Sequence, residues 1–142
     1  MKINGNLILT CIGVVGGCVA NMLGGWDTGL ITLVIFMSID YITGLIVAGI
    51  FHKSKKTNNG MLESRAGFKG LCRKGMILLV VLIATRLDLV IQTNFIRDAV
   101  VIGYIVNETL SIIENAALMG IPIPNAITKG IEILQDREKE GN

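Results

Sequence analysis

The sequence has few of the side chains that most enzymes use for chemistry. Its 142 residues include one histidine, His52, and three cysteines, Cys11, Cys18 and Cys72. A lone histidine provides neither a metal site nor a nucleophile–base pair, and an odd number of cysteines cannot all pair within one chain. Cys11 and Cys18 are too far apart along a helix for a disulfide, so we interpret the cysteines as small apolar residues. We predict no catalytic residue, no metal and no cofactor.

Charged residues are also scarce. Asp, Glu, Lys and Arg make up 17% of the chain and apolar residues 51%, whereas soluble domains average about 25% charged residues. The mean hydropathy is +0.63. The formal net charge of +2 indicates no strongly acidic or basic partner. This composition predicts a membrane protein.

Long apolar segments are what the sequence does contain. They occupy residues 7–24, 28–51, 75–92 and 98–119, and each is long enough to cross a bilayer as a helix. A signal peptide is the alternative for the first segment, but Lys2 supplies little charge and Ala20-Asn21-Met22 is a poor cleavage site. We predict an all-α polytopic domain over residues 1–124 with about four transmembrane helices. A three-span arrangement stays open, because charges weaken the last two segments.

Small residues mark places where helices could approach closely. Gly13 and Gly17 form a GxxxG pattern, and further small residues continue along a neighbouring line of the helix. Such faces promote helix association in lipid, within one chain or between chains. The candidate packing residues are Gly13, Gly16, Gly17, Ala20, Gly24 and Gly44.

Polar residues within the apolar segments are the candidate functional residues. A carboxylate facing lipid costs about 2.5–3.5 kcal/mol on insertion scales, so such groups should meet water or a partner. Within residues 107–124, one helical face carries Asn107, Ser111, Glu114 and Asn115, and an overlapping face carries Glu108, Ser111 and Asn115. Asp40 and Arg86 lie in other segments, and we expect Arg86 to reach Asp40, Glu108 or Glu114, or to extend to the outer interface. The candidate pore-lining or inter-helix residues are Asp40, Arg86, Asn107, Glu108, Ser111, Glu114 and Asn115.

Intramembrane hydrolysis by Glu108 and Glu114 is a disfavoured alternative. Six residues separate them, which places them about 9 Å apart along a helix axis and on differing faces.

A basic segment at residues 52–74 separates the second and third apolar segments. It holds seven Lys or Arg residues against one acid, Glu63: Lys53, Lys55, Lys56, Arg65, Lys69, Arg73 and Lys74. Nucleic-acid binding is conceivable, but a cytoplasmic loop following the positive-inside rule is favoured. We expect Leu62–Leu71 to form a short helix on the anionic inner surface of the membrane.

The charge distribution also predicts the topology. With the basic loop inside, eleven of the thirteen Lys and Arg residues are cytoplasmic, Arg97 is outside and Arg86 lies within a span. Both termini are then cytoplasmic. Residues 125–142 are predicted to form a cytoplasmic amphipathic tail, because Ile127, Ile131 and Leu134 recur at helical spacing.

The sequence resembles the toxin-secretion and phage-lysis holins, the family that includes clostridial-type phage holins. The resemblance covers roughly residues 38–124 and includes Asp40-Tyr41-Ile42-Thr43-Gly44, then Ser64, Gly67, Gly70 and Lys74. Its most specific part is the block from Asn107 to Asn115 followed by Gly120-Ile121-Pro122-Ile123-Pro124.

The resemblance implies a homo-oligomer in the bacterial cytoplasmic membrane that opens lesions for an endolysin or a toxin, without requiring direct binding to either. It supplies no catalytic residues. The expected partners are copies of the chain and anionic headgroups, and no nucleic acid. A small oligomeric ion channel or transporter subunit, an antiholin that regulates a holin, and a structural scaffold remain alternatives.

Overall fold

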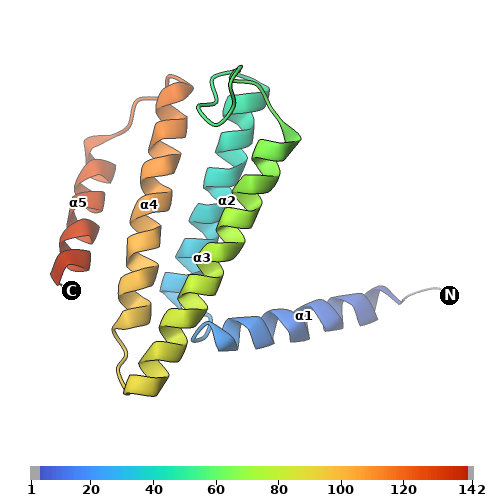
Figure 1. Cartoon of the computed structure of the whole chain (residues 1–142), viewed down its shortest axis with the longest axis vertical. Coiled ribbons are helices and arrows are strands. Elements are labelled where there is room, and N and C mark those ends of the chain that lie inside the picture. Colours follow the sequence, from blue (N-terminus) through green and yellow to red (C-terminus); the bar gives the residue numbers. More distant parts are fainter. Residues whose placement is uncertain (1–3, 141–142) are drawn as a thin grey trace.

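The structure is a computed structural model that describes residues 4–140, apart from the side chain of Glu138. This part of the chain forms five α-helices and no strand: α1 (Gly5–Met22), α2 (Thr28–Gly49), α3 (Ser64–Ile91), α4 (Ile96–Leu118) and α5 (Asn125–Glu140). Helices α2, α3 and α4 stand side by side, α5 runs back along α4, and α1 projects sideways from the end where α2 begins (Figure 1). The predicted all-α fold is confirmed.

Local capping explains where several helices begin and end. The Asp27 carboxylate accepts a hydrogen bond from the Leu30 N–H at 2.8 Å, which satisfies a free donor in the first turn of α2. After α4, Gly120 adopts a φ of +79°, a conformation that glycine takes without strain. Pro122 and Pro124 then keep the chain extended until α5 begins.

The basic segment is not a single loop, and this corrects the boundaries expected from the sequence. Its second half, from Ser64 to Lys74, is the start of α3 and continues without a break into the apolar segment. The separate short helix expected at Leu62–Leu71 is therefore absent, and the non-helical connection is limited to residues 50–63. Gly75 does not interrupt α3, because an interior glycine costs a helix only about 1 kcal/mol relative to alanine.

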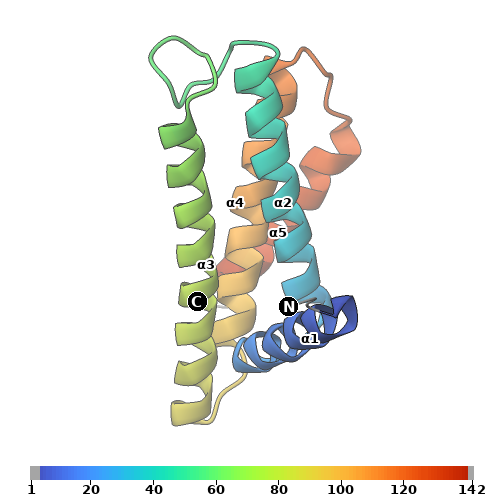
Figure 2. The same ribbon diagram turned by 90° about the vertical axis from the view of Figure 1, so that its right-hand side faces the viewer.

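Helix α4 lies at the centre of the molecule and contacts α2, α3 and α5. Figure 2 shows α4 behind α2 and α3, with α5 beyond it. The core between these helices is made of large apolar side chains. Its buried members are Leu23, Leu30, Leu33, Met37, Ile77, Val81, Val101 and Ile105.

Helix α1 makes little use of its small residues within the chain. A Cβ added to Gly13, Gly16 or Gly17 would meet nothing within 4 Å, and Ala20 is the one buried residue of the helix. The small-residue face of α1 is thus unpartnered within the described chain.

The other two candidate packing glycines lie in close contacts. Gly24 follows α1 in a turn with a φ of +92°, and its Cβ position lies 2.5 Å from Nε of Arg97. The Cβ position of Gly44 lies 3.8 Å from Nδ2 of Asn115, so Gly44 marks the approach of α2 to α4. A side chain at Gly24 would displace Arg97, whereas a methyl group at Gly44 would be in ordinary contact with Asn115.

Two of the described helices, α1 and α2, are long and apolar enough to cross a membrane. Large apolar side chains are exposed along α1 and also along α3, where a soluble protein would carry polar groups. Those on α1 include Leu7, Leu9, Ile12, Val14 and Val15, and those on α3 include Met76, Leu79, Ile83, Leu87 and Val90. This outer surface suits lipid.

Candidate functional site

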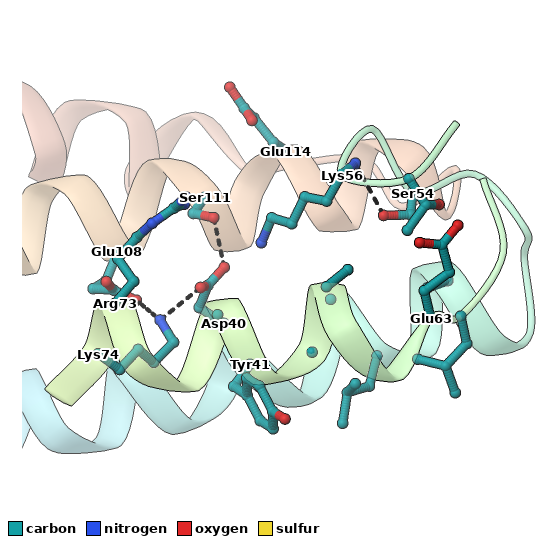
Figure 3. Close-up of a pocket in the computed structure, with 18 of the residues that line it drawn as sticks. Asp40, Tyr41, Ser54, Lys56, Glu63, Arg73, Lys74, Glu108, Ser111 and Glu114 are labelled. Carbon is teal, nitrogen blue, oxygen red and sulfur yellow. Dashed lines mark hydrogen bonds and ion pairs between the residues drawn. The ribbon is translucent and has the colours of Figure 1, made fainter. Parts of the chain in front are cut away.

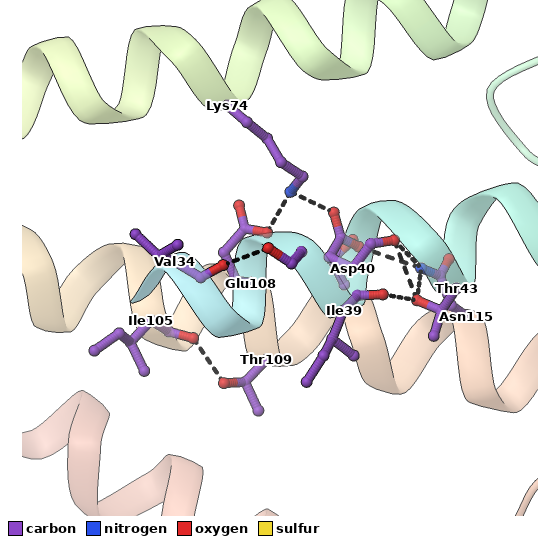
Figure 4. Close-up of polar contacts among 11 residues, drawn as sticks. Val34, Ile39, Asp40, Thr43, Lys74, Ile105, Glu108, Thr109 and Asn115 are labelled. Atoms are coloured by element: carbon purple, nitrogen blue, oxygen red, sulfur yellow. Dashed lines mark hydrogen bonds and ion pairs between the residues drawn. The ribbon is translucent and has the colours of Figure 1, made fainter. Parts of the chain in front are cut away.

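The centre of the candidate site is an ionic cluster that joins three helices. Nζ of Lys74, on α3, lies 2.7 Å from Oδ2 of Asp40 on α2 and 2.5 Å from Oε2 of Glu108 on α4. Figure 4 shows the ammonium group between the two carboxylates. The Lys74, Asp40 and Glu108 side chains are 12%, 7% and 4% exposed. One lysine thus connects two carboxylates whose side chains are almost fully covered.

Polar side chains of α2 and α4 complete the hydrogen bonding of Asp40. The Ser111 hydroxyl donates to Oδ1 of Asp40 at 2.5 Å. The Asn115 amide donates to the same oxygen at 3.2 Å and to the Thr43 hydroxyl at 2.9 Å. No buried side-chain polar atom in the described chain lacks a hydrogen-bond partner. The cluster is therefore a closed network, which is the condition under which buried charges are tolerated.

The charges within the cluster do not cancel. Two carboxylates face one ammonium group, so the cluster carries a net charge of −1 when all three groups are ionised. Lys56 extends from the 50–63 connection toward Asp40 without forming an ion pair with it (Figure 3). Its positive charge balances the cluster at longer range.

A cavity of about 410 Å³ lies beside the cluster, between α2, α3 and α4 and beneath the 50–63 connection. Charged and polar groups from all of these segments line it, including Lys56, Glu63, Arg73 and Asn107. Glu114 also lines the cavity, with its carboxylate directed away from Asp40 (Figure 3). Polar groups of α4 can therefore reach water at this end of the bundle.

The structure separates the predicted polar stripe into two parts. Glu108, Ser111 and Asn115 turn inward to Asp40 and Lys74. Asn107 and Glu114 are exposed. Of the two overlapping faces in the sequence, the one that contains Glu108 is thus the face that packs against α2 and α3.

Arg86 does not form an ion pair with Asp40, Glu108 or Glu114, which was one of the two expectations for it. It is exposed on α3, and the ion pairs among the described side chains involve Lys74 and Arg97 instead. Arg86 lies in the same half of α3 as Asp88, near the end of the bundle away from Asp40, so its side chain remains free to extend to an interface.

Lys74 is the site residue that sequence reasoning missed, because it was grouped with the basic loop. A signal was present in its spacing. Arg65, Lys69 and Arg73 recur at i, i+4 and i+8 and form one exposed stripe on α3, whereas Lys74 is displaced from that stripe by one residue. A lysine on a different face at the start of an apolar helix indicates an inward partner.

A second polar cluster lies at the opposite end of the bundle. Arg97 forms an ion pair with Asp27, with Nη1 2.5 Å from Oδ2, and its Nε donates to the Leu23 carbonyl at 2.6 Å. Asp88 accepts hydrogen bonds from the backbone N–H of Ile96 at 3.1 Å and of Arg97 at 2.8 Å. This cluster fixes the turns that join α1 to α2 and α3 to α4.

The Asp27 carboxyl is held ionised by its neighbours. The hydrogen bond from Arg97 lowers the pKa of Asp27 below its ordinary value, against a smaller opposing effect of burial. Because Asp27 is about half exposed, solvent weakens this interaction.

These features define a class of protein before any comparison. Helices long and apolar enough to cross a membrane, an exposed apolar surface and charges paired inside the bundle together describe an α-helical membrane protein. Among the residues described, no group of His, Cys, Asp or Glu is arranged to hold a metal ion.

Comparison with known proteins then identifies the family. Residues 17–136 match the bacteriophage holin family, so this chain belongs to that family. It is 38% identical over 98 residues to a protein of Bacillus phage phi105 described as a probable holin, covering 68% of this chain and 67% of the phage protein.

Bacterial relatives cover more of the chain. A Clostridium perfringens protein, described as an uncharacterized 14.9 kDa protein in the nagH 3′ region, is 38% identical over 82% of this chain and 84% of its own length. The uncharacterized protein Lin0175 of Listeria innocua is 40% identical over 84% of this chain and 82% of its own length. No solved structure matches the chain.

Proposed function

We propose that this protein is a holin that oligomerises in the bacterial cytoplasmic membrane and opens lesions that release an endolysin or a toxin. Membership of the holin family supports this role. The observation that carries the mechanism is the Lys74 cluster, which holds the carboxylates of α2 and α4 inside a single subunit.

The cluster suggests how a closed state and an open state could exchange. In the closed subunit, Lys74 and Ser111 satisfy the carboxylates of Asp40 and Glu108, so neither of these two groups meets lipid unpaired. In an oligomer around a water-filled lesion, the same groups can be hydrated and no longer need to pair. Because only several subunits together can enclose water, opening becomes cooperative in subunit number.

The proposed topology has four spans, α1 to α4, with both termini in the cytoplasm. Because α1 projects sideways in the structure (Figure 1), this topology requires α1 to turn into line with α2, α3 and α4 in the membrane. The basic residues at the start of α3, Arg65, Lys69 and Arg73, then contact anionic headgroups of the inner leaflet. Cys72 provides a test of this arrangement. In intact cells a membrane-impermeant maleimide should label an Asn94→Cys variant from outside and leave Cys72 unlabelled; labelling of Cys72 instead would contradict the topology.

The proposal gives the chain no enzymatic role, no cofactor and no nucleic-acid partner. Its partners are further copies of itself and membrane lipid, and its connection to an endolysin or toxin requires no direct binding.

The experiment that tests the function is inducible expression in a bacterial host together with a cytoplasmic endolysin. We expect a delay, then abrupt loss of membrane potential and lysis that depends on the endolysin. Depolarisation without release of protein would contradict the holin function and favour a small ion channel. An unchanged membrane potential would contradict both the holin and the ion channel and leave an antiholin or a scaffold. Co-expression with a holin separates these two, because an antiholin delays lysis and a scaffold does not.

A further inference from the structure

Helix α5 occupies a place that a lipid environment does not permit. It runs back along α4 toward the end of the bundle where α4 begins (Figure 1). With 16 residues, it extends for about 24 Å beside a helix that the proposed function places across the membrane. Its distal end therefore lies deep within the thickness of the bilayer.

The outer face of α5 is charged from its second turn to its end. Lys129, Glu132, Asp136, Arg137, Lys139 and Glu140 are all exposed. None of these six forms an ion pair with another described side chain. Unpaired charges at membrane depth are costly unless they face water.

The inner face of α5 is apolar and contacts the bundle. Ile131 is 7% exposed, and Leu134 packs against the core between α2, α3 and α4. Ile133, on the outer face, is 59% exposed. The helix is thus attached to the bundle through one face and presents charge on the other.

The opposite part of the molecule has the reverse character. The exposed residues of α1, and those of α3 beyond its first turns, are mostly large and apolar. A single subunit therefore has a lipid-compatible surface on α1 and α3 and a water-compatible surface on α5. A ring of such subunits satisfies both surfaces only if α5 faces inward.

From these contrasts we infer that α5 stays docked on α4 in the membrane and that its charged face lines the aqueous lumen of the lesion. This inference rests on the proposed function and assigns a specific element to the lumen wall. In this arrangement α5 begins in the cytoplasm and folds back into the lumen, so the inference replaces the cytoplasmic placement of the tail in the proposed topology.

Spin labels in proteoliposomes test the location of α5. Cys11, Cys18 and Cys72 are first replaced by serine, and the full-length protein is then labelled at Glu132→Cys together with Ala117→Cys on α4. We expect the distance between the labels to match the docked structure. Single labels at positions 132 and 79 are then compared, with Leu79→Cys on α3 as the lipid-facing reference. A water-soluble nickel chelate should relax the label at position 132 several-fold more than the label at position 79, and oxygen should relax it less.

Two results would overturn the inference. A lengthened distance between the labels would mean that α5 leaves α4, and strong relaxation by oxygen at position 132 would place α5 in lipid. Release of an entrapped protein from the same proteoliposomes reports on the holin function separately. Leakage with an undocked α5 would remove the inference and leave the proposed function intact.

A matched pair of isoleucines provides the functional test. Ile131→Asp places a charge on the docked face, whereas Ile133→Asp places the same charge two residues away on the outer face. We expect Ile131→Asp to abolish protein release and Ile133→Asp to leave it within about twofold. Loss of release in Ile133→Asp with normal membrane insertion would contradict a lumen-facing surface, and normal release in Ile131→Asp would contradict docking.

Discussion

The two polar clusters of this molecule contain similar groups and differ in what surrounds them. Asp40 and Glu108 are buried, Lys74 is only 12% exposed, and all three lie within helices and away from the helix ends. Arg97 is buried as well, but its partner Asp27 is about half exposed, and Asp88 bonds mainly to backbone N–H groups at a helix start. The second cluster is attached to turns, where backbone donors need acceptors in any case.

This difference indicates separate roles. A cluster at helix ends stabilises the connections and can be hydrated without moving the helices. A cluster of buried charges between helices keeps those helices together, and its members must find water or new partners if the helices separate. The Lys74 cluster is therefore the one whose disruption should change function as well as stability.

The largest expected difference between the two clusters is in the stability lost when Lys74 or Arg97 is removed. Lys74→Met leaves two buried carboxylates without a counter-charge, so we expect the free energy of unfolding to fall by about 3–5 kcal/mol. Arg97→Met should cost less, because Asp27 can turn to solvent. Thermal unfolding of the purified proteins in detergent measures both, with the exposed Lys69→Met as the control. An equal loss for Lys74→Met and Lys69→Met would show that the cluster does not stabilise the bundle.

Two carboxylates of α4 should differ in their effect on lysis. Glu108→Leu removes a partner of Lys74 and alters the closed state, so we expect the onset of lysis to shift clearly. Glu114→Leu removes an exposed carboxylate and should shift the onset much less. Culture turbidity after induction measures the onset, with equal membrane accumulation confirmed by immunoblot. If both variants lyse like the wild type with unchanged lesion size, the polar face of α4 has no part in opening.

Within the second cluster, loss of the Asp88 acceptor should have a smaller effect. Asp88→Ala removes the acceptor for the Ile96 and Arg97 N–H groups, and loss of a helix cap typically costs about 1 kcal/mol. Asp88→Asn keeps an oxygen acceptor and should cost less. Faster hydrogen exchange at these two amides would locate the effect at the start of α4. Unchanged exchange in Asp88→Ala would contradict the capping role.

The smallest expected effect is a pH dependence at Asp27. Its pKa is lowered in the folded protein by Arg97, so its contribution to stability is present above the pKa of the unfolded chain. The contribution is lost as pH falls through the lower folded pKa. The melting temperature of the wild type should therefore fall more between pH 5 and pH 2 than that of Asp27→Asn. Parallel curves for the two proteins would contradict this assignment.

Much of the helical framework could be predicted from local sequence. Asp27 before Thr28 marks the start of α2, and Gly120 with Pro122 marks the end of α4, because capping and breaking depend on neighbouring residues alone. The predicted start of the third apolar helix, at residue 75, was wrong because the prediction separated a short helix at Leu62–Leu71 from the apolar segment, whereas Ser64–Ile91 is one continuous helix. A helix tolerates charge on any face that meets water or a partner, and α3 has both.

The candidate site was predicted in part. The helical spacing of Glu108, Ser111 and Asn115 placed them on one face, and in the structure all three form hydrogen bonds to Lys74 or Asp40. Arg86 and Lys74 are both cations near the ends of the third apolar segment, and local pattern could not decide which of them reaches the carboxylates. The crossing of α3 over α2 and α4 decides it, since it brings Lys74 to the level of Asp40.

The sequence by itself therefore determined that this protein is helical, suited to a membrane and a member of the holin family, because hydropathy, capping and family motifs are local properties of the chain. Only the tertiary structure decided which cation pairs with Asp40 and Glu108, that the small-residue face of α1 is left free within the described chain, and that α5 docks on α4. These outcomes depend on how helices far apart in sequence pack against one another. That packing depends on the shape and charge of whole helix faces, so no single sequence motif predicts it.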